Sequence, residues 1–437
     1  MRHKQGKGIV DSIKPARILI DDRTILIQWT GMPMAYSFDS APKDDPLIRS
    51  TFHRFLVAFA APARWPTWAI YLSAATLAAA VAVVWAAMGS GFNNALLLFL
   101  ITASCFVADR NLLVTLPGRR VSFGPWQSQL FALALPRAAA ALIFGLLLPW
   151  LGWTVAFYAN IAVQFIGYIA LYRGAIVEPG RLTLTEQPIL LDRLAPGSRG
   201  LRILHISDLH IECLSVRETQ LLEMMHSAAA DVILITGDYV NISFNVDPLT
   251  HAQVRELLGK LDAPLGIYAV PGSPAVDLPD VVPPLFEGTP VRLLRNETVV
   301  ITAPGGERFT IMGLDCRHDI AADTMTMDRV QATANEEGPR ILLYHSPDLM
   351  PQAIDREIDL YLCGHTHGGQ VRLPIIGPIL TSSKLGRRYV MGHYAAGRTH
   401  LYVSRGVGFE GLGAPRVRLF CPPEIALITL SGGEVGQ

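Results

Sequence analysis

Two long stretches of the sequence contain no charged residue, and they constrain the fold more than any other feature. The first runs from Pro66 to Ala108 and the second from Ala138 to Tyr172. A helix needs about 20 apolar residues to cross the hydrocarbon core of a bilayer, so each stretch is long enough for two crossings with a turn between them. Only 17% of the residues are charged, against about 25% in soluble proteins. The sequence therefore predicts four membrane-spanning helices, near residues 67–88, 93–113, 131–149 and 153–173.

Basic residues surround the predicted helices unevenly. The turns inside the two stretches, at residues 89–94 and 149–153, contain no Lys or Arg, whereas the connecting loop and both flanks are basic. The positive-inside rule therefore predicts that the loop and both flanks are cytoplasmic. The five scattered cysteines, with no CxxC pair, agree with a reducing compartment. The basic residues concerned are Arg54, Arg64, Arg110, Arg119, Arg120, Arg137, Arg173 and Arg181.

These features predict a multi-pass protein of the cell membrane with four parts. An N-terminal cytoplasmic segment (1–64) precedes a transmembrane domain of four helices (65–174), a linker with an edge strand (175–200) and a large cytoplasmic domain (201–437). An anchor is the simplest role for the helices. A transporter or channel is the alternative, but the two stretches lack the ionisable groups that substrate pathways usually need. In the N-terminal segment, "ARILIDDRTILIQW" predicts a small hairpin.

The C-terminal half contains short apolar runs that each stop at polar residues able to bind a metal. Buried strands with helical stretches between them, such as "SVRETQLLEMMHSAAA", predict a layered α/β domain. Folds of this class place their active sites at the carboxyl ends of the strands. The runs are "LRILHISDLH" with Asp208 and His210, "DVILITGDYVN" with Asp238 and Asn241, "GIYAVPGSPAVD", "RILLYHSPD" with His345, and "IDLYLCGHTHGG" with His365 and His367.

The spacing of these residues suits a metal centre. Residues i and i+2 of an extended chain point the same way, so Asp208 with His210, and His365 with His367, each present two ligands to one cavity. Carboxylate and imidazole together favour Mn, Fe, Co or Zn over Ca or Mg. Two such ions bridged by one carboxylate would bind a phosphate group and activate water. Each piece alone has a structural explanation, but the ordered set does not. Close approach of the backbone is favoured by Gly237, Gly364, Gly368 and Gly369.

The ordered set D-x-H, G-D, H and G-H-x-H resembles the calcineurin-like metallophosphoesterase family, in its membrane-anchored branch of YkuE-like and transmembrane members. The motifs cover Leu201 to Gln370, and "LYVSRGVG" and "PPEIALITL" resemble the closing strands. The resemblance implies a four-layer α/β/β/α sandwich that hydrolyses a phosphoester or pyrophosphate with metal-activated water. It also implies a first metal held by Asp208, His210 and His367, a second held by His345 and His365, and Asp238 bridging both.

The expected partners follow from this resemblance and from the composition. A phosphorylated, amphiphilic and lipid-linked substrate fits a domain that is tethered to a bilayer, and membrane lipid is the second partner. Lys+Arg and Asp+Glu balance at 37 each, so nothing in the overall charge points to nucleic acid.

The turn after "GIYAV" departs from the family pattern. The family has G-N-H-D or G-N-H-E there, with the Asn on the second metal and the His stabilising the transition state. This chain has Gly272, Ser273 and Pro274. Serine is a weaker ligand, which would weaken the second site, and proline has no polar side-chain atom. Two hypotheses remain: an active enzyme whose second site is completed by Ser273 or by the nearby Asp277, or a catalytically impaired metal-binding sensor or scaffold.

Three further features lie outside the ordered set of motifs. His205 lies within a strand and is expected to be a packed core residue. The stretch "LDCRHD", with Asp315, His318 and Asp319, is expected to be a solvated loop rather than part of the cleft. A basic cluster that lies near the membrane and attracts an anionic substrate or lipid headgroup is predicted for Lys384, Arg387 and Arg388.

Overall fold

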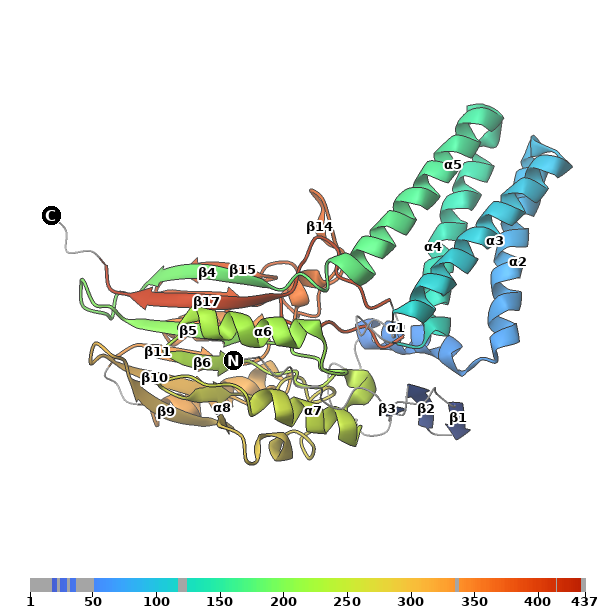
Figure 1. Cartoon of the computed structure of the whole chain (residues 1–437). Helices are drawn as coiled ribbons and strands as arrows, with labels where there is room; N and C mark the ends of the chain where they lie inside the picture. Colours follow the sequence, from blue (N-terminus) through green and yellow to red (C-terminus); the bar gives the residue numbers. More distant parts are fainter. Residues whose placement is uncertain are drawn as a thin grey trace, which may run out of the picture.

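Four apolar helices follow a short helix α1 (Thr51–Ala60) in the computed structural model of the chain (Figure 1). The structure describes residues 51–116, 124–334, 338–413 and 415–433, together with the backbone of three N-terminal strands. These strands, β1 (Ile18–Asp21), β2 (Thr24–Trp29) and β3 (Met32–Tyr36), form an antiparallel sheet. The predicted N-terminal hairpin is thus confirmed as β1–β2. Arg119 and Arg120 lie outside the described residues.

The described residues contain four helices long and apolar enough to cross a membrane, as predicted. The third begins at Trp126, five residues before the predicted start, because the prediction followed the apolar run and omitted a polar first turn. The second turn lies at Leu147, and Gly152 has a non-helical φ of 73°. The helices are α2 (Thr67–Trp85, continued by Ala86–Ser90), α3 (Phe92–Thr115), α4 (Trp126–Leu146) and α5 (Leu148–Tyr172, continued by Arg173–Val177).

Helices α3, α4 and α5 share a buried polar cluster. Arg137 of α4 donates from Nε and Nη2 to the carboxylate of Asp109 in α3, at 2.5 and 2.8 Å, and from Nη1 to the backbone oxygen of Gln164 in α5 at 2.9 Å. The side-chain amide of Gln164 donates back to the carbonyl of Arg137 at 3.0 Å. Asp109 and Arg137, which border the two uncharged stretches, are therefore paired with each other inside the bundle. This pair, whose charges balance, and the amide of Gln164 tie the three helices together.

We expect the Asp109→Asn variant to be less stable by about 1.5–3 kcal/mol, because Arg137 keeps its buried charge and loses the carboxylate that balances it. Thermal unfolding of the purified full chain in detergent measures the change. The double variant Asp109→Leu/Arg137→Met should regain most of the loss, since it removes both charges together. A single variant as stable as the parent would contradict the pairing.

The C-terminal part contains two six-stranded sheets, of order β4-β17-β5-β6-β7-β8 and β15-β16-β12-β11-β10-β9. Strands β5 to β8 run parallel, as do β10, β11, β12 and β16. Strand β4 pairs with β17 along its whole length, which confirms the edge strand predicted before residue 200. The bounds are β4 Thr183–Leu190, β5 Leu201–Ile206, β6 Val232–Ile235, β7 Ile267–Ala269, β8 Val291–Leu293, β9 Glu297–Thr302, β10 Arg308–Gly313, β11 Arg340–Leu343, β12 Leu360–Cys363, β15 Gly392–Ala396, β16 Thr399–Val403 and β17 Glu424–Ser431.

Three hydrophobic layers hold the sheets and their helices together. Successive side chains of a strand point to opposite faces, so Ile203 of β5 joins Ile341 of the other sheet, whereas its neighbour Leu204 joins Leu221 of α6. A third layer packs the second sheet against α8 and α9. The result is the four-layer α/β/β/α sandwich that was predicted (Figure 1). The covering helices are α6 (Val216–Ala228), α7 (Pro248–Leu258), α8 (Ile320–Gln331) and α9 (Met350–Asp355).

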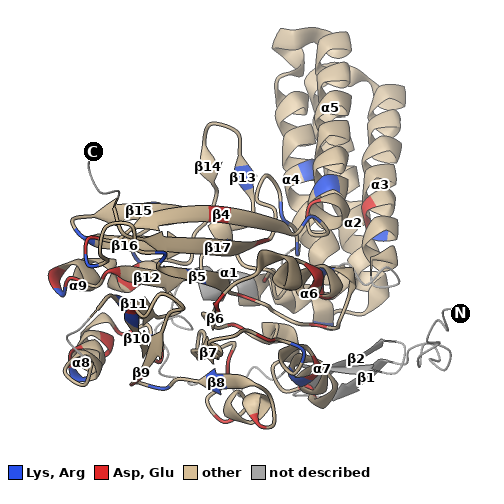
Figure 2. Cartoon of the chain, turned by 60° about the vertical axis from the view of Figure 1, so that its left-hand side comes forward, with Lys and Arg blue, Asp and Glu red and all other residues tan. Residues whose placement is uncertain are grey.

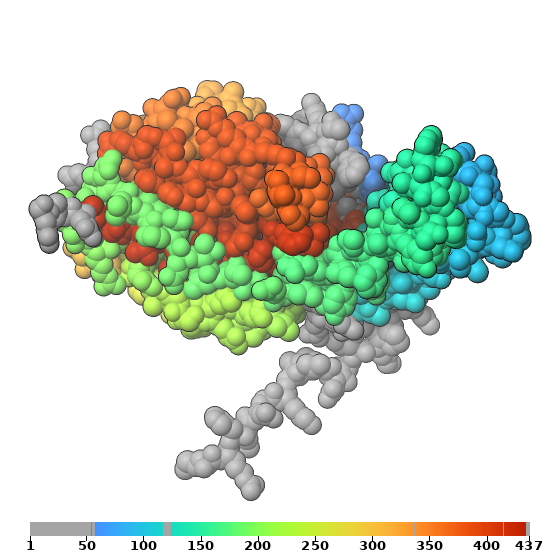
Figure 3. Space-filling view, turned by 90° about the horizontal axis from the view of Figure 1, so that it is seen from above, coloured from blue at the N-terminus to red at the C-terminus, as the bar shows by residue number. Residues whose placement is uncertain are grey.

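The helical bundle stands at one end of the sandwich (Figure 3). Ala60 of α1 packs with Ile242, Val276 and Leu412 of the sandwich, and its carbonyl accepts a hydrogen bond from Ser128 of α4. Strand β17 points away from the bundle in Figure 1, and β5 runs antiparallel to it. The carboxyl ends of β5 and its parallel neighbours therefore face the end of the sandwich at which the helical bundle stands.

Candidate metal centre

Four strands deliver six metal-competent side chains to this edge, next to the helical bundle. Strand β5 leads to Asp208 and His210, β6 to Asp238, β11 to His345, and β12 to His365 and His367. All six are buried. They form two groups, and within each group one potential ligand atom per residue lies within 4.8 Å of the others: Asp208, His210 and His367 in the first, and Asp238, His345 and His365 in the second. The structure thus brings together the six residues that the resemblance assigns to the metals, whereas Asn241, which also follows β6, is not among them.

Sharp backbone turns aim these side chains. Five of the six residues have a positive φ, between 39° for His210 and 68° for His365, and only His345 does not. A non-glycine residue in this left-handed region costs about 1–3 kcal/mol and is concentrated at functional sites. The neighbouring glycines allow the backbone to approach these ligands closely. A Cβ on Gly364 would collide with the carboxylate of Asp208, and Gly237 has a φ of 93°.

The first group is oriented by residues outside the sequence motifs. The Nδ1 atom of His210 lies 2.9 Å from Oε2 of Glu410, and its Nε2 atom lies 3.1 Å from Nε2 of His367. Burial alone would lower the pKa of His210, but Glu410, with Asp238 and Asp208, raises it to about 9. Burial, together with nearby His210 and Arg418, holds the pKa of His367 well below its usual value. His367 is therefore a neutral imidazole, as metal binding requires.

In the second group, the carboxylate of Asp238 lies next to His345 and also next to His210 of the first group. The Nδ1–H of His345 donates to the carbonyl of Thr236 at 2.7 Å, and its Nε2 atom lies 3.2 Å from Asp238 Oδ2. The same oxygen lies 3.4 Å from Nε2 of His210 in the first group. Burial would raise the pKa of Asp238, but His345 and His210 hold it well below its usual value. Asp238 is thus an ionised carboxylate that touches both groups, as a bridging ligand must.

The residues present fit a divalent metal centre. One ring nitrogen of His345 donates to a backbone carbonyl, which leaves the other for a metal, as is usual in metal-binding histidines. Among the described residues, the buried Nε2 atom of His365 has no hydrogen-bond partner. Buried polar atoms are normally paired, so this nitrogen indicates a ligand. Imidazole and carboxylate donors suit Mn, Fe, Co or Zn.

We expect metal affinity to rise with pH up to about 9. In the metal-free protein Asp238 raises the pKa of His345 to about 9 against the opposing effect of burial, and His210 has a similar value. Below that pH a bound proton competes with the metal, so affinity should fall about tenfold per pH unit for each proton displaced. Calorimetric titration of Mn²⁺ in two buffers of different ionisation enthalpy measures both affinity and proton release. Binding that is independent of pH and releases no proton would contradict the assignment.

The turn after β7 brings Ser273 and an unexpected histidine into the second group. Ser273 Oγ lies 3.3 Å from Nδ1 of His365 and 3.1 Å from Nε2 of His318. His318 is buried, its ring lies 4.8 Å from that of His365, and its φ of 54° matches the ligand residues. Burial and the nearby His365 and His345 hold its pKa well below the usual value. The expectation of a solvated loop is therefore wrong for His318, because β10 and α8 carry it into the cleft.

Other candidates have structural roles. Asp277 was a possible ligand of the second site, but its carboxylate accepts hydrogen bonds from the backbone N–H groups of Asp238, Tyr239 and Gly272, at 2.8 to 2.9 Å. It fixes the turn that carries Asp238, and both of its oxygens accept from backbone N–H groups. Asn241 caps a short helical turn, accepting from Ser243 N at 2.9 Å.

The other residues singled out in the sequence are placed as follows. His205 is a core residue, as predicted, and bonds Thr236 Oγ1 at 2.8 Å. Asp315 pairs with Arg295, and Asp319 caps α8. Lys384 contacts the carbonyl of His318, and Arg387 donates to the carbonyl of Ile376.

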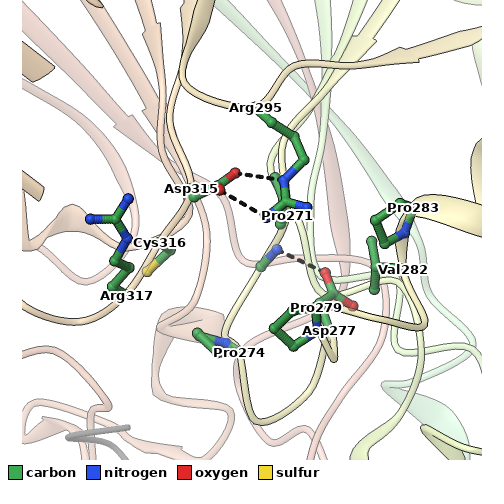
Figure 4. A pocket seen from close by; sticks show the side chains of 11 residues that line it. Pro271, Pro274, Asp277, Pro279, Val282, Pro283, Arg295, Asp315, Cys316 and Arg317 are labelled. Carbon is green, nitrogen blue, oxygen red and sulfur yellow. Dashed lines mark hydrogen bonds and ion pairs between the residues drawn. The ribbon is translucent and has the colours of Figure 1, made fainter. Parts of the chain in front are cut away.

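A cavity of about 150 Å³ lies beside the altered turn. Pro271, Pro274 and Cys316 line it, and the ion pair between Arg295 and Asp315, at 2.9 Å, closes one wall (Figure 4). Pro274 presents only its ring to this space. The site therefore has room for a larger side chain at position 274.

Glu410 and Arg418 are the site residues that the sequence motifs missed. Glu410 contacts His210, and Arg418 Nη2 lies 3.2 Å from Nδ1 of His367 while its guanidinium also donates to the carbonyls of Arg405 and Gly406. Neither follows a strand with ligand-like spacing. No signal in the sequence distinguishes them from other charged loop residues.

Comparison with known proteins agrees with this geometry. The family model described as calcineurin-like phosphoesterase matches residues 201–369, which include all six ligand candidates. The metallophosphoesterase YkuE of Bacillus subtilis is 32% identical over 260 residues, covering 58% of this chain and 87% of that protein. The phosphodiesterase YaeI of Escherichia coli is 29% identical over 265 residues, covering 58% and 90%. A transmembrane protein with metallophosphoesterase domain from Bos taurus is 30% identical over 255 residues, covering 54% of each chain.

Proposed function

Because the chain belongs to the calcineurin-like metallophosphoesterase family, we propose that it is a membrane-anchored phosphohydrolase that cleaves a phosphoester or pyrophosphate bond. One observation carries the proposal: two buried groups of three ligand candidates meet at the membrane-proximal edge of the sandwich. Divalent ions held there would polarise the phosphoryl oxygens and lower the pKa of a water molecule. The tether to the bilayer favours an amphiphilic, lipid-linked substrate.

The residues around the ligands have separate tasks in this proposal. Glu410 and the carbonyl of Thr236 orient His210 and His345, so that both Nε2 atoms face Asp238. Ser273 takes the place of the family's Asn beside His365. His318 supplies the imidazole N–H that the family's His would direct at the phosphoryl group, because it is the buried histidine next to Ser273 that belongs to neither ligand group.

A second function stays open because of Pro274. Its side chain can neither donate nor accept a proton. If His318 does not replace the missing imidazole, the domain binds metal and a phosphorylated ligand as a sensor or scaffold. This alternative predicts metal binding without turnover in the natural chain.

The test uses the full chain in detergent. Metal content is measured first, and hydrolysis of p-nitrophenyl phosphate, bis(p-nitrophenyl) phosphate and a lipid-linked pyrophosphate is then followed. Treatment with EDTA should abolish turnover, and Mn²⁺ should restore it. Two ions per chain with no turnover on any of these substrates would favour the sensor or scaffold. A chain without bound metal would contradict both functions.

We also propose that the sandwich faces the cytoplasm, which the basic loop and flanks support by the positive-inside rule. A fluorescent reporter that matures only in the cytoplasm, fused to the C-terminus, should be bright. A periplasmic or extracellular alkaline phosphatase reporter at the same point should be silent. The opposite pattern would overturn the orientation.

A further inference from the structure

An exposed apolar hairpin leaves the sandwich immediately after the metal ligands. Residues 371–380, called the 371–380 hairpin here, comprise β13 (Arg372–Leu373) and β14 (Gly377–Pro378). At its tip Ile375 is fully exposed and Ile376 is 60% exposed. Leu373, Ile379 and Leu380 of the same hairpin are also exposed. Exposed apolar groups that cluster in this way mark a surface that contacts a partner or a membrane.

The base of the hairpin is linked to the end of helix α5 through residues 418–420. Arg372 N donates to the carbonyl of Leu419 at 2.9 Å, and Arg418 N donates to the carbonyl of Gly174 at 2.9 Å. Between these bonds, the ring of Phe420 lies 5.1 Å from the guanidinium carbon of Arg173. Two consecutive backbone links thus join the hairpin to the end of a membrane-spanning helix. The height of the hairpin relative to the bilayer is set by that helix.

The hairpin also points in the direction of the helices. In Figure 1 the loop at β14 rises from the sandwich on the same side as α5, and Figure 2 shows the same arrangement after a turn of 60°. In both views its tip lies beside the bundle rather than below it. A bilayer that surrounds α2 to α5 would therefore meet the tip.

The charges nearby suit the surface of a membrane. The segment 371–391 has four basic residues and no acidic one. Figure 2 shows that the tip of the hairpin is uncharged, with a basic stretch at β13. Apolar side chains next to Lys and Arg are typical of segments that sit in the interface of an anionic leaflet. The basic residues are Arg372, Lys384, Arg387 and Arg388.

We propose that the 371–380 hairpin inserts its isoleucines into the lipid leaflet beside α5. Residues at both ends of the hairpin donate hydrogen bonds to the backbone of the loop that carries His365 and His367. Arg372 donates to the carbonyl of Gly368, and Ser382 Oγ donates to the carbonyl of His365 at 2.7 Å. Insertion therefore holds the ligand-bearing loop of β12 against the headgroup region. The inference requires α2 to α5 to lie in a bilayer, and it does not depend on hydrolysis.

The test measures lipid contact residue by residue in the full chain. The partly exposed Cys105 and Cys213 are replaced by alanine, and a fluorescent label is placed at Ile376→Cys. The protein is reconstituted in nanodiscs of phosphatidylcholine with a quarter phosphatidylglycerol, with and without lipids that carry a quencher in the acyl chain. Two matched sites are labelled in parallel: Ile166→Cys on the exposed side of α5, and Met325→Cys, an exposed residue of α8.

We expect quenching at position 376 to approach that at position 166 and to exceed that at position 325 severalfold. Quenching at 376 no greater than at 325, with strong quenching at 166, would overturn the inference. Weak quenching at 166 would instead show that the helices do not lie in the bilayer, which overturns the inference together with the proposed anchor.

A second variant separates insertion from misfolding. Adding Ile375→Glu to the labelled protein should expel the tip and remove most of the quenching at position 376. Metal content equal to that of the parent confirms that the adjoining centre is intact. If quenching at 376 persists with the glutamate, the signal does not come from insertion of the tip, and the inference fails.

Discussion

The Asp238→Asn variant is expected to lose metal-dependent hydrolysis by at least about 10³-fold in kcat. Asp238 Oδ2 lies 3.4 Å from Nε2 of His210 and 3.2 Å from Nε2 of His345, so it is the carboxylate that touches both ligand groups. Asparagine keeps the shape but carries no negative charge to balance a divalent ion. Charge stabilisation by a metal contributes several kcal/mol to the transition state, and each 1.36 kcal/mol is worth a factor of ten in rate.

Steady-state kinetics and metal content of the full chain, measured side by side, test this expectation. The matched control is Asp359→Asn, a buried aspartate at the opposite end of β12 that accepts from the backbone N–H of Arg340 at 2.8 Å. The control should retain the parent's activity and metal content even if its thermal stability falls. An Asp238→Asn variant with two bound ions and undiminished kcat would show that Asp238 is not a bridging ligand.

The His318→Gln variant is expected to lower kcat by about 10²–10³-fold, the usual cost of removing a hydrogen-bond donor aimed at transition-state charge, while the chain keeps its metal. The reason is the contact between His318 Nε2 and Ser273 Oγ at 3.1 Å, next to a turn whose Pro274 carries no polar group. His226→Gln, an exposed histidine of α6, is the matched control and should not change the rate.

Rescue distinguishes a chemical role of His318 from a structural one. In the His318→Gln background, Ser273→Asn/Pro274→His restores the family's motif, and the cavity beside Pro274 offers room for the new ring (Figure 4). If His318 replaces the missing imidazole, the triple variant should recover most of the lost rate. A loss of bound metal in His318→Gln, or a failure of rescue with metal retained, would assign His318 to the support of the second ligand group instead.

Much of the fold was predictable because it depends on local patterns. Strands β5, β6, β11 and β12 are short runs of β-branched and aliphatic residues that stop at polar ones, so both their type and their ends were visible. Parallel strands with buried faces require helices outside, which is why the layered class followed. The start of α4 was missed because its first turn is polar, and no hydropathy argument recovers such residues.

The sequence by itself determined the four apolar helices and the identity of the six ligand candidates. Charged residues are costly in lipid, so membrane-spanning segments are visible as long uncharged stretches. Residues at i and i+2 after a strand stay together in any fold that keeps the strand. Only the tertiary structure decided that His318 reaches Ser273, that Glu410 orients His210, and that the 371–380 hairpin rises beside α5. The first two contacts join residues that are 45 and 200 positions apart, and all three arrangements depend on how distant parts of the fold pack rather than on any local pattern of residues.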